Sequence, residues 1–364
     1  MPLNLVVQTA FLGDLLLSIP LLKRCRQTWP EHQLGLVCRK GFGDFFLKTK
    51  LVDHVFEIKK GDAETYKKIL TDLAKFEINY LVSPHESMRT VFFCHQIKAQ
   101  HKISFKNLWN FWAFDQRVKK PLQLPDPLRQ MSLLSVVDKD LGEKILHYHK
   151  TERPFEAGKY GKLSNPPPWA SMSLRPQVLE LTDLYESLKN RYDLKAVDEG
   201  RAVLLFPGSV WATKRWTVEG FVNVGNSLQE NGYQVYVMGG PGEEALADQV
   251  ASQIPKSICI AGKTAIIESA QIIARARLVV GNDSASTHLA AMCETPLIAV
   301  FGPTVLEFGF RPWSDSSYVA QREKLACRPC GKHGHKVCPI KTHVCMKNLP
   351  PEQVLQAADF ILRS

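Results

Sequence analysis

The chain has 364 residues, of which 45% are hydrophobic and 23% are charged, and its formal net charge at pH 7 is +10. These values are typical of a soluble globular protein with two domains, each long enough to bury its own core. No apolar run approaches the ~20 residues that cross a bilayer, and the first residues lack the basic and apolar regions of a signal peptide, so we expect a cytoplasmic protein.

The first part of the chain alternates short apolar strands with helices. Asp14 follows the first expected strand and a glycine turn, at the opening of the first helix, where an aspartate serves as a helix cap or faces a ligand crevice. The alternation favours a parallel, doubly wound α/β sheet over a sandwich or a helical bundle. Strands are expected at 4–8, 33–38, 52–58 and 80–83, and helices at 14–28 and 65–75.

Basic and aromatic residues are interleaved from Ser87 to Gln130. Residues 1–168 hold 26 Lys and Arg against 17 Asp and Glu, a net charge of +9, whereas the remainder carries +1. We therefore expect the first half to meet an anionic partner, such as a phosphorylated glycolipid or an acidic membrane leaflet. No nucleic-acid-binding motif accompanies the charge, so nucleic acid is not an expected partner.

A helix is expected at 131–148, and the proline-rich residues 154–168 then end the first domain. The second domain is expected at 169–347. A C-terminal helix is expected within 348–364, and packing of this helix back against the first domain is one alternative. In the second domain, strands are expected at 203–206, 234–238, 258–261, 278–281 and 296–301, and helices at 178–192, 218–231, 243–253 and 266–275.

Two strands of the second domain end in turns that suit a nucleoside diphosphate. After the strand at 203–206, Ser209 and Lys214 offer a hydroxyl and a cation beside a glycine turn, where the backbone approaches a phosphate closely. Glu243 follows the next strand and a pair of glycines, and a carboxylate in that place holds a ribose diol in dinucleotide sites.

The strand at 278–281 leads into Asn282 and the polar run that opens a buried helix. Backbone amides of Ser284, Ala285 and the next serine point at an anion there, and the helix dipole adds positive potential. Asp283 is placed to accept from a sugar hydroxyl, with His288 one turn into the helix. An ordinary helix N-cap without a ligand is the alternative.

Taken in order, these motifs resemble those of the family 9 glycosyltransferases, the ADP-heptose:lipopolysaccharide heptosyltransferases, and are closest to the heptosyltransferase II branch. The resemblance covers nearly the whole chain. It implies the GT-B fold, with two Rossmann-like domains facing a central cleft. The motifs are Phe206-Pro207-Gly208, Lys214-Arg215-Trp216, Gly239-Gly240 with Glu243-Glu244, Gly281-Asn282-Asp283-Ser284 with His288, and Phe301-Gly302-Pro303-Thr304.

The implied activity is metal-independent, inverting transfer of heptose from ADP-heptose to an inner-core sugar of lipopolysaccharide, without a required cofactor. Asp14, in the motif Leu12-Gly13-Asp14, corresponds to the family's proposed catalytic base, and Lys214 would offset charge on the departing ADP. The implied setting is a monomer, peripheral at the cytoplasmic face of the inner membrane. The substrate-binding residues would be Ser209, Ser284 and Ala285 for phosphates, Glu243 for ribose, and Asp283 and His288 for the donor sugar.

One residue departs from the family pattern, since Ala285 stands where glycine is usual. A related transferase with a different donor or acceptor, or a glycolipid-binding relative without turnover, therefore remains an alternative. A dinucleotide-dependent oxidoreductase is a further one, but neither Thr9 to Asp14 nor Pro207 to Trp211 supplies the glycine pattern that such an enzyme needs.

The nine cysteines are not expected to form disulfides in the cytoplasm. Five are scattered among apolar residues and suit core packing, whereas Cys327, Cys330, Cys338 and Cys345 are clustered, with histidines between them. These four have the ligand types of a structural zinc or iron site, although their spacing is not that of a standard finger. A reduced thiol cluster that braces an irregular loop is the interpretation we favour.

Overall fold

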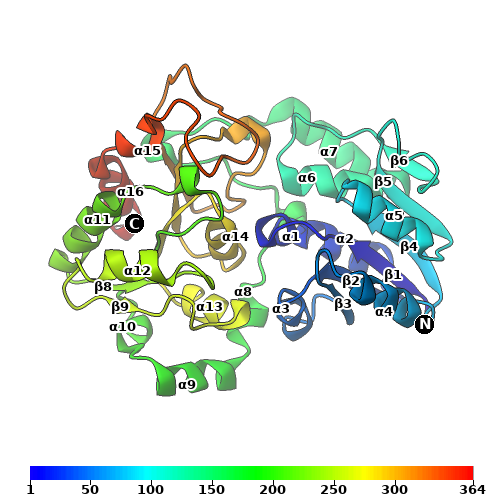
Figure 1. The fold of residues 1–364 in the computed structure, drawn as a ribbon, viewed down its shortest axis with the longest axis horizontal. Helices are drawn as coiled ribbons and strands as arrows, with labels where there is room; N and C mark the ends of the chain where they lie inside the picture. The colour runs from blue at the N-terminus through cyan, green and yellow to red at the C-terminus, as the bar shows by residue number, and fades with distance from the viewer. Residues whose placement is uncertain (364) are drawn as a thin grey trace. The chain divides into compact units, whose positions relative to one another are not determined.

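The computed structural model describes residues 1–363. The chain forms two compact units, Met1–Glu152 and Arg153–Ser364 (Figure 1). Each unit contains one six-stranded sheet, and every strand pair in both sheets is parallel. The α/β class expected from the alternation of strands and helices is thereby confirmed.

The sheet of the first unit has the strand order β3-β2-β1-β4-β5-β6. Its first strand is buried along its whole length and apolar except for Asn4, as expected for a strand covered on both faces. The strands are β1 (Leu3–Val7), β2 (Gln33–Arg39), β3 (His54–Ile58), β4 (Ile78–Ser83), β5 (His101–Phe105) and β6 (Gln116–Val118). The helices are α1 (Leu12–Leu16), α2 (Ile19–Thr28), α3 (Gly43–Lys48), α4 (Ala63–Leu73), α5 (Met88–Gln96), α6 (Asp126–Met131) and α7 (Lys139–Thr151).

The sheet of the second unit has the strand order β12-β11-β10-β7-β8-β9. If its strands are counted from β7 as the first, this order read backwards is 3-2-1-4-5-6, the same as in the first unit. The strands are β7 (Ala202–Phe206), β8 (Gln234–Val237), β9 (Ile258–Cys259), β10 (Leu278–Asn282), β11 (Leu297–Phe301) and β12 (Ser317–Gln321). The helices are α8 (Arg175–Leu179), α9 (Thr182–Arg191), α10 (Lys195–Asp198), α11 (Val218–Glu230), α12 (Glu244–Ala251), α13 (Ile266–Ile273), α14 (Ala285–Met292), α15 (Val344–Lys347) and α16 (Pro351–Arg363).

Three expected helices are interrupted in the structure. The one expected at 178–192 is broken at residues 180–181, between α8 and α9. The other two lie in the first unit. The first, expected at 14–28, divides into α1 and α2 because Pro20 lies in the first turn of α2 and its ring would clash within a continuous helix. The second, expected at 131–148, becomes a 3-10 turn at Ser132–Val136 followed by α7. Asp138 caps α7 by accepting from the Leu141 amide at 3.0 Å, which starts a new helix there.

The division between the units falls before the proline-rich segment that was expected to end the first domain. Residues after Arg153 are tied to the second unit: the Leu163 amide donates to the Ser317 carbonyl at 3.0 Å, and the Trp313 indole donates to the Ala170 carbonyl at 2.8 Å. The C-terminal helix α16 also packs in the second unit, since its Val354 and Ile361 belong to that unit's core. No helix among residues 1–363 combines the length and apolar character needed to cross a bilayer.

Candidate active site

The site in the second unit is built where β7 and β10 lie side by side. Helical connections leave these neighbouring strands in opposite directions, and this switch point opens a crevice at the carboxyl ends of the strands in doubly wound sheets. Gly281 of β10 is in register with Phe206 of β7, so the turns after the two strands meet at one edge. The motifs that pointed to a diphosphate site are therefore brought together.

Asn282 joins these two turns. Its side chain is fully buried, and its Nδ2 donates to the Pro207 carbonyl at 2.8 Å and to the Gly208 carbonyl at 3.3 Å. Its Oδ1 accepts from the Trp216 amide at 2.9 Å, which fixes the chain just after Lys214. A buried amide with these three partners holds the edge of the site rigid.

Lys214 and Asp283 form an ion pair at this edge. The Lys214 Nζ lies 2.6 Å from the Asp283 Oδ2, and only 12% and 5% of the two side chains are exposed. The Thr304 hydroxyl donates to the same oxygen at 2.7 Å. Because solvent screens such a pair little, the Lys214 ammonium group is held in one place at this edge.

His288 lies near this pair, one turn into α14, and is 4% exposed. Burial lowers its pKa to about 4, since the opposing effect of Asp283 is smaller and Lys214 lowers the pKa further. The imidazole is therefore neutral at neutral pH. Its Nδ1 has no hydrogen-bond partner among residues 1–363, which is unusual for a buried ring nitrogen.

The first turn of α14 is open to an anion. Ser284 precedes the helix with an extended backbone, and its side chain makes no cap hydrogen bond to the helix amides. Its hydroxyl instead lies 2.8 Å from that of Ser286. Ala285 is the first helical residue, so its backbone needs no glycine, and the departure from the family pattern introduces a methyl group without backbone strain.

Glu243 lies against the turn after β7. A Cβ on Gly208 would come 2.2 Å from the Glu243 carboxyl carbon, so a larger residue there would displace the Glu243 carboxylate. The Glu243 carboxylate also accepts from the Gly240 amide at 2.9 Å. Ser209 is 3% exposed in the same turn, where its carbonyl accepts from the Arg215 side chain at 2.9 Å.

The cysteine-rich segment, residues 327–345, packs on the chain around Lys214. The Thr213 hydroxyl accepts from the His335 amide at 2.7 Å, and the Thr213 amide donates to the His335 carbonyl at 3.1 Å. The His343 Nε2 lies 2.8 Å from the Thr213 carbonyl. On the other side, the Cys330 amide donates to the Pro303 carbonyl at 3.1 Å, next to Thr304. The segment thus contacts the turn that carries Lys214 and the turn that carries Thr304, the hydroxyl partner of Asp283.

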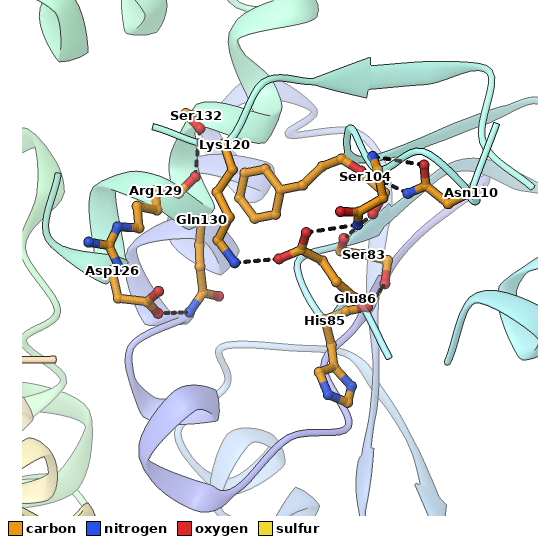
Figure 2. A network of polar contacts seen from close by, with 12 residues as sticks. Ser83, His85, Glu86, Ser104, Asn110, Lys120, Asp126, Arg129, Gln130 and Ser132 are labelled. Carbon is orange, nitrogen blue, oxygen red and sulfur yellow. Dashed lines mark hydrogen bonds and ion pairs between the residues drawn. The ribbon is translucent and has the colours of Figure 1, made fainter. Parts of the chain in front are cut away.

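Asp14 lies in the first unit, near the amino-terminal end of α1. Its carboxylate accepts from the Phe11 amide at 3.2 Å, as a cap does, and its carbonyl accepts from Ser18 at 3.0 Å and Gln130 at 3.3 Å. Gln130 is itself held by the buried Asp126, whose Oδ2 accepts at 2.6 Å (Figure 2). Ser18 and Gln130 therefore hold the backbone that carries Asp14 in place.

Cationic groups gather at the carboxyl ends of the strands in the first unit. The pKa of Lys60, which follows β3, is lowered by desolvation and by the positive charges of Arg39 and Arg89. The pKa of His85, which follows β4, is lowered to about 4, first by burial and then by Arg39 and Lys60. Figure 2 shows His85 beside Glu86, which pairs with Lys120.

Comparison with known proteins agrees with this geometry. Residues 171–341 match the model of glycosyltransferase family 9 (heptosyltransferase). The lipooligosaccharide heptosyltransferase 2 of Campylobacter jejuni is 29% identical over 265 residues, which cover 68% of this chain and 80% of that protein. Residues 171–341 therefore form a glycosyltransferase family 9 (heptosyltransferase) domain.

The fold of this chain is also that of solved structures. The Escherichia coli ADP-heptose lipopolysaccharide heptosyltransferase II superposes with a TM-score of 0.75 at 17% identity, over 100% of this chain and 99% of that one. The expected GT-B class, with two Rossmann-like units, is confirmed. The iron-containing dodecameric glycosyltransferase TibC from enterotoxigenic E. coli superposes with a TM-score of 0.52 at 16% identity, over 100% of this chain and 76% of that one.

The four clustered cysteines are the candidates for a metal site. The pKa of the Cys345 thiol is raised to about 11, first by burial and then by the other three thiols, so the four lie near one another. No group of three or more metal-binding side chains within residues 1–363 has the geometry to hold an ion. Placed in this way, these cysteines do not fit a metal centre.

Several residues that shape the site were not singled out from the sequence. Thr304 and Asn282 belong to the recognised motifs, but their bonds to Asp283 and to the turn after β7 required the fold. Thr213 and His343 are separated by 130 residues, and no local pattern indicates that they meet. A buried polar residue beside an expected turn, such as Asn282, was the one signal available.

Proposed function

We propose that this protein is an inverting glycosyltransferase that moves heptose from ADP-heptose to an inner-core sugar of lipopolysaccharide. The observation that carries the proposal is the Lys214–Asp283 ion pair, at 2.6 Å, beside the open first turn of α14. A cation, oriented amides and a helix dipole converge there, which is the chemistry that stabilises a departing diphosphate.

Each donor group has a proposed partner in the second unit. The diphosphate lies on the amides of Ser284 and Ala285, with Ser209 as a hydroxyl donor and Lys214 as the cation. Glu243, which is fixed against Gly208, accepts from the ribose hydroxyls. Asp283 and His288 meet hydroxyls of the heptose. The neutral His288 is suited to that role because a neutral ring offers both a donor and an acceptor.

Asp14 is the proposed general base. It takes the proton from the acceptor hydroxyl as that oxygen bonds to the anomeric carbon, while the bond from this carbon to ADP breaks and the electron pair leaves on the phosphate. Attack opposite the leaving group inverts the anomeric centre. The cations around Lys60, Arg39 and Arg89 are proposed to attract the anionic acceptor.

The decisive experiment is calorimetric titration of the protein with ADP, GDP, UDP and NAD. We expect ADP to bind at least about tenfold more tightly than GDP or UDP, because ADP is the nucleotide part of the proposed donor. NAD should bind weakest. Preference for NAD would contradict a transferase. Preference for GDP or UDP would keep the transferase and change its donor.

Transfer is further proposed to need no metal ion and no cofactor. Elemental analysis of protein purified without a chelator or a metal-binding tag should find less than about 0.2 metal ions per chain. Protein with Cys327→Ser and Cys330→Ser is the matched control. A full equivalent in the parent that this variant loses would overturn the thiol-cluster interpretation, and would place a structural metal in the cysteine-rich segment.

The enzyme is proposed to act as a monomer, peripheral to the cytoplasmic face of the inner membrane, where a lipid-anchored acceptor is presented. The support is the charge of the first unit: residues 1–152 hold 23 Lys and Arg against 16 Asp and Glu, a net charge of +7. Such a charge draws a protein to an anionic leaflet.

A further inference from the structure

Large apolar side chains stand in solvent on α5 and on the loop after β5, which we call the aromatic patch. Helix α5 buries Val91, Phe93 and Cys94 in the core of the first unit, so the opposite face is turned outward. The exposed fractions in the patch are 61% for Met88, 52% for Phe92, 98% for Leu108, 64% for Phe111 and 37% for Trp112.

The patch is one surface. Met88 and Phe92 are one helical turn apart and therefore neighbours on α5. The rings of Phe92 and Trp112 pack with their centroids 5.0 Å apart, which joins the helix to the loop. Leu108 and Phe111 project from the same short loop as Trp112.

The loop is held in place from inside. Asn110 is fully buried, and its Nδ2 donates to the Phe105 carbonyl at 2.7 Å while its Oδ1 accepts from the Asn107 amide at 3.1 Å. The Asn107 side chain donates to Glu86 at 2.9 Å, and Glu86 pairs with Lys120 (Figure 2). A loop fixed in this way presents its apolar side chains to solvent permanently, where they add nothing to the core.

The surroundings of the patch are positive. Arg89, Lys98, Lys106 and Lys119 are all exposed within the same segment. Its exposed acidic residue is Asp115, while Asp126 is buried. Exposed aromatic and leucine side chains among cations match a bilayer interface with anionic headgroups, because the rings enter the headgroup layer and the cations remain outside it.

We propose that α5 and the loop 106–115 dock this protein on an anionic lipid bilayer. Phe92, Leu108 and Phe111 enter the headgroup layer, and the neighbouring cations contact lipid phosphates. The inference rests on the proposed membrane location and not on the transfer reaction, so it is tested without donor or acceptor.

The test is co-sedimentation of the full chain with vesicles of phosphatidylcholine alone, or of phosphatidylcholine mixed with phosphatidylglycerol. The wild type should partition to the mixed vesicles, and Phe92→Ser combined with Leu108→Ser and Phe111→Ser should reduce that partition at least about tenfold. The matched control changes three exposed apolar residues elsewhere in the first unit, Leu47→Ser, Val136→Ser and Leu146→Ser, and should partition as the wild type does.

A second variant tests the charge. Lys98→Gln, Lys106→Gln and Lys119→Gln together should weaken binding to the mixed vesicles and remove its dependence on phosphatidylglycerol. Thermal unfolding and ADP titration should be unchanged in every variant, since the substituted side chains are already exposed; this separates a failed docking surface from a failed donor site.

Three outcomes would overturn the proposal. They are a wild type that ignores both vesicle types, a patch variant that still binds the mixed vesicles fully, and wild-type self-association without vesicles that the patch variant abolishes. The last result would make the patch an interface between protein chains.

Discussion

Asp14 accepts from the Phe11 amide at 3.2 Å, so the same carboxylate that is proposed as the base also closes the start of α1. The substitution Asp14→Asn separates the two roles, because an asparagine oxygen still caps a helix and an amide takes no proton. We expect the variant to keep its unfolding temperature and its affinity for ADP, and to transfer heptose at least about 100-fold more slowly. Turnover near that of the wild type would leave Asp14 with the capping role alone.

At the scale of elements, the turn that carries Lys214 is shaped by a segment more than a hundred residues away. The Thr213 hydroxyl donates to the His335 carbonyl at 2.9 Å and accepts from the His335 amide at 2.7 Å. Gly334 fits between them with φ +84, and a Cβ there would come 3.1 Å from the Thr213 hydroxyl. The close approach explains why a glycine lies at the bend.

The matched variants Thr213→Ser and Thr213→Val test this clamp. Valine leaves the half-buried His335 amide without its partner, although the His335 carbonyl keeps the Thr213 amide, at a cost of about 1–3 kcal/mol, and lets the Lys214 turn shift. ADP affinity should fall about tenfold in the valine variant and stay within about twofold in the serine variant, as measured by calorimetry. Equal affinities in the two variants would mean that the segment does not position Lys214.

At the scale of the molecule, every residue proposed to hold the donor belongs to the second unit, which has its own sheet and its own core. A fragment spanning residues 153–364 is therefore expected to fold cooperatively and to bind ADP within about tenfold of the full chain. Circular dichroism with thermal melting checks folding, and calorimetry checks binding. A folded fragment that ignores ADP would show that the first unit contributes to donor binding.

The sequence predicted the regular parts of both sheets because their apolar runs are continuous. Strands β7 and β10 fall within a residue or so of the expected bounds, and both are buried throughout. Strands β5 and β6 were not predicted: β5 opens with His101 and Lys102, and β6 has three half-buried residues, so neither has a clear apolar run. Strand β5 is placed by pairing with β4, and β6 by pairing with β5, a long-range effect that local propensity does not contain.

For the site, the sequence supplied residue types and left the contacts open. Lys214 and Asp283 were given separate ligands, whereas the structure pairs them at 2.6 Å and adds Thr304 to the same oxygen. Asp14 stays a prediction as the base. Contacts of this kind depend on which strands are neighbours, and strand order is not written in any one segment.

The common strand order of the two sheets has a consequence for how such enzymes diversify. Each half of the chain has its own sheet, and the hydrogen bonds that shape the two sheet edges share no residue. Gln130 and Asp126 act in the first half, and Asn282 and Thr304 act in the second. Mutations can therefore retune one half without repacking its counterpart. Donor residues are proposed in the second half and the acceptor surface in the first. Exchange of first halves between related enzymes is therefore expected to change the acceptor and to leave the donor unchanged.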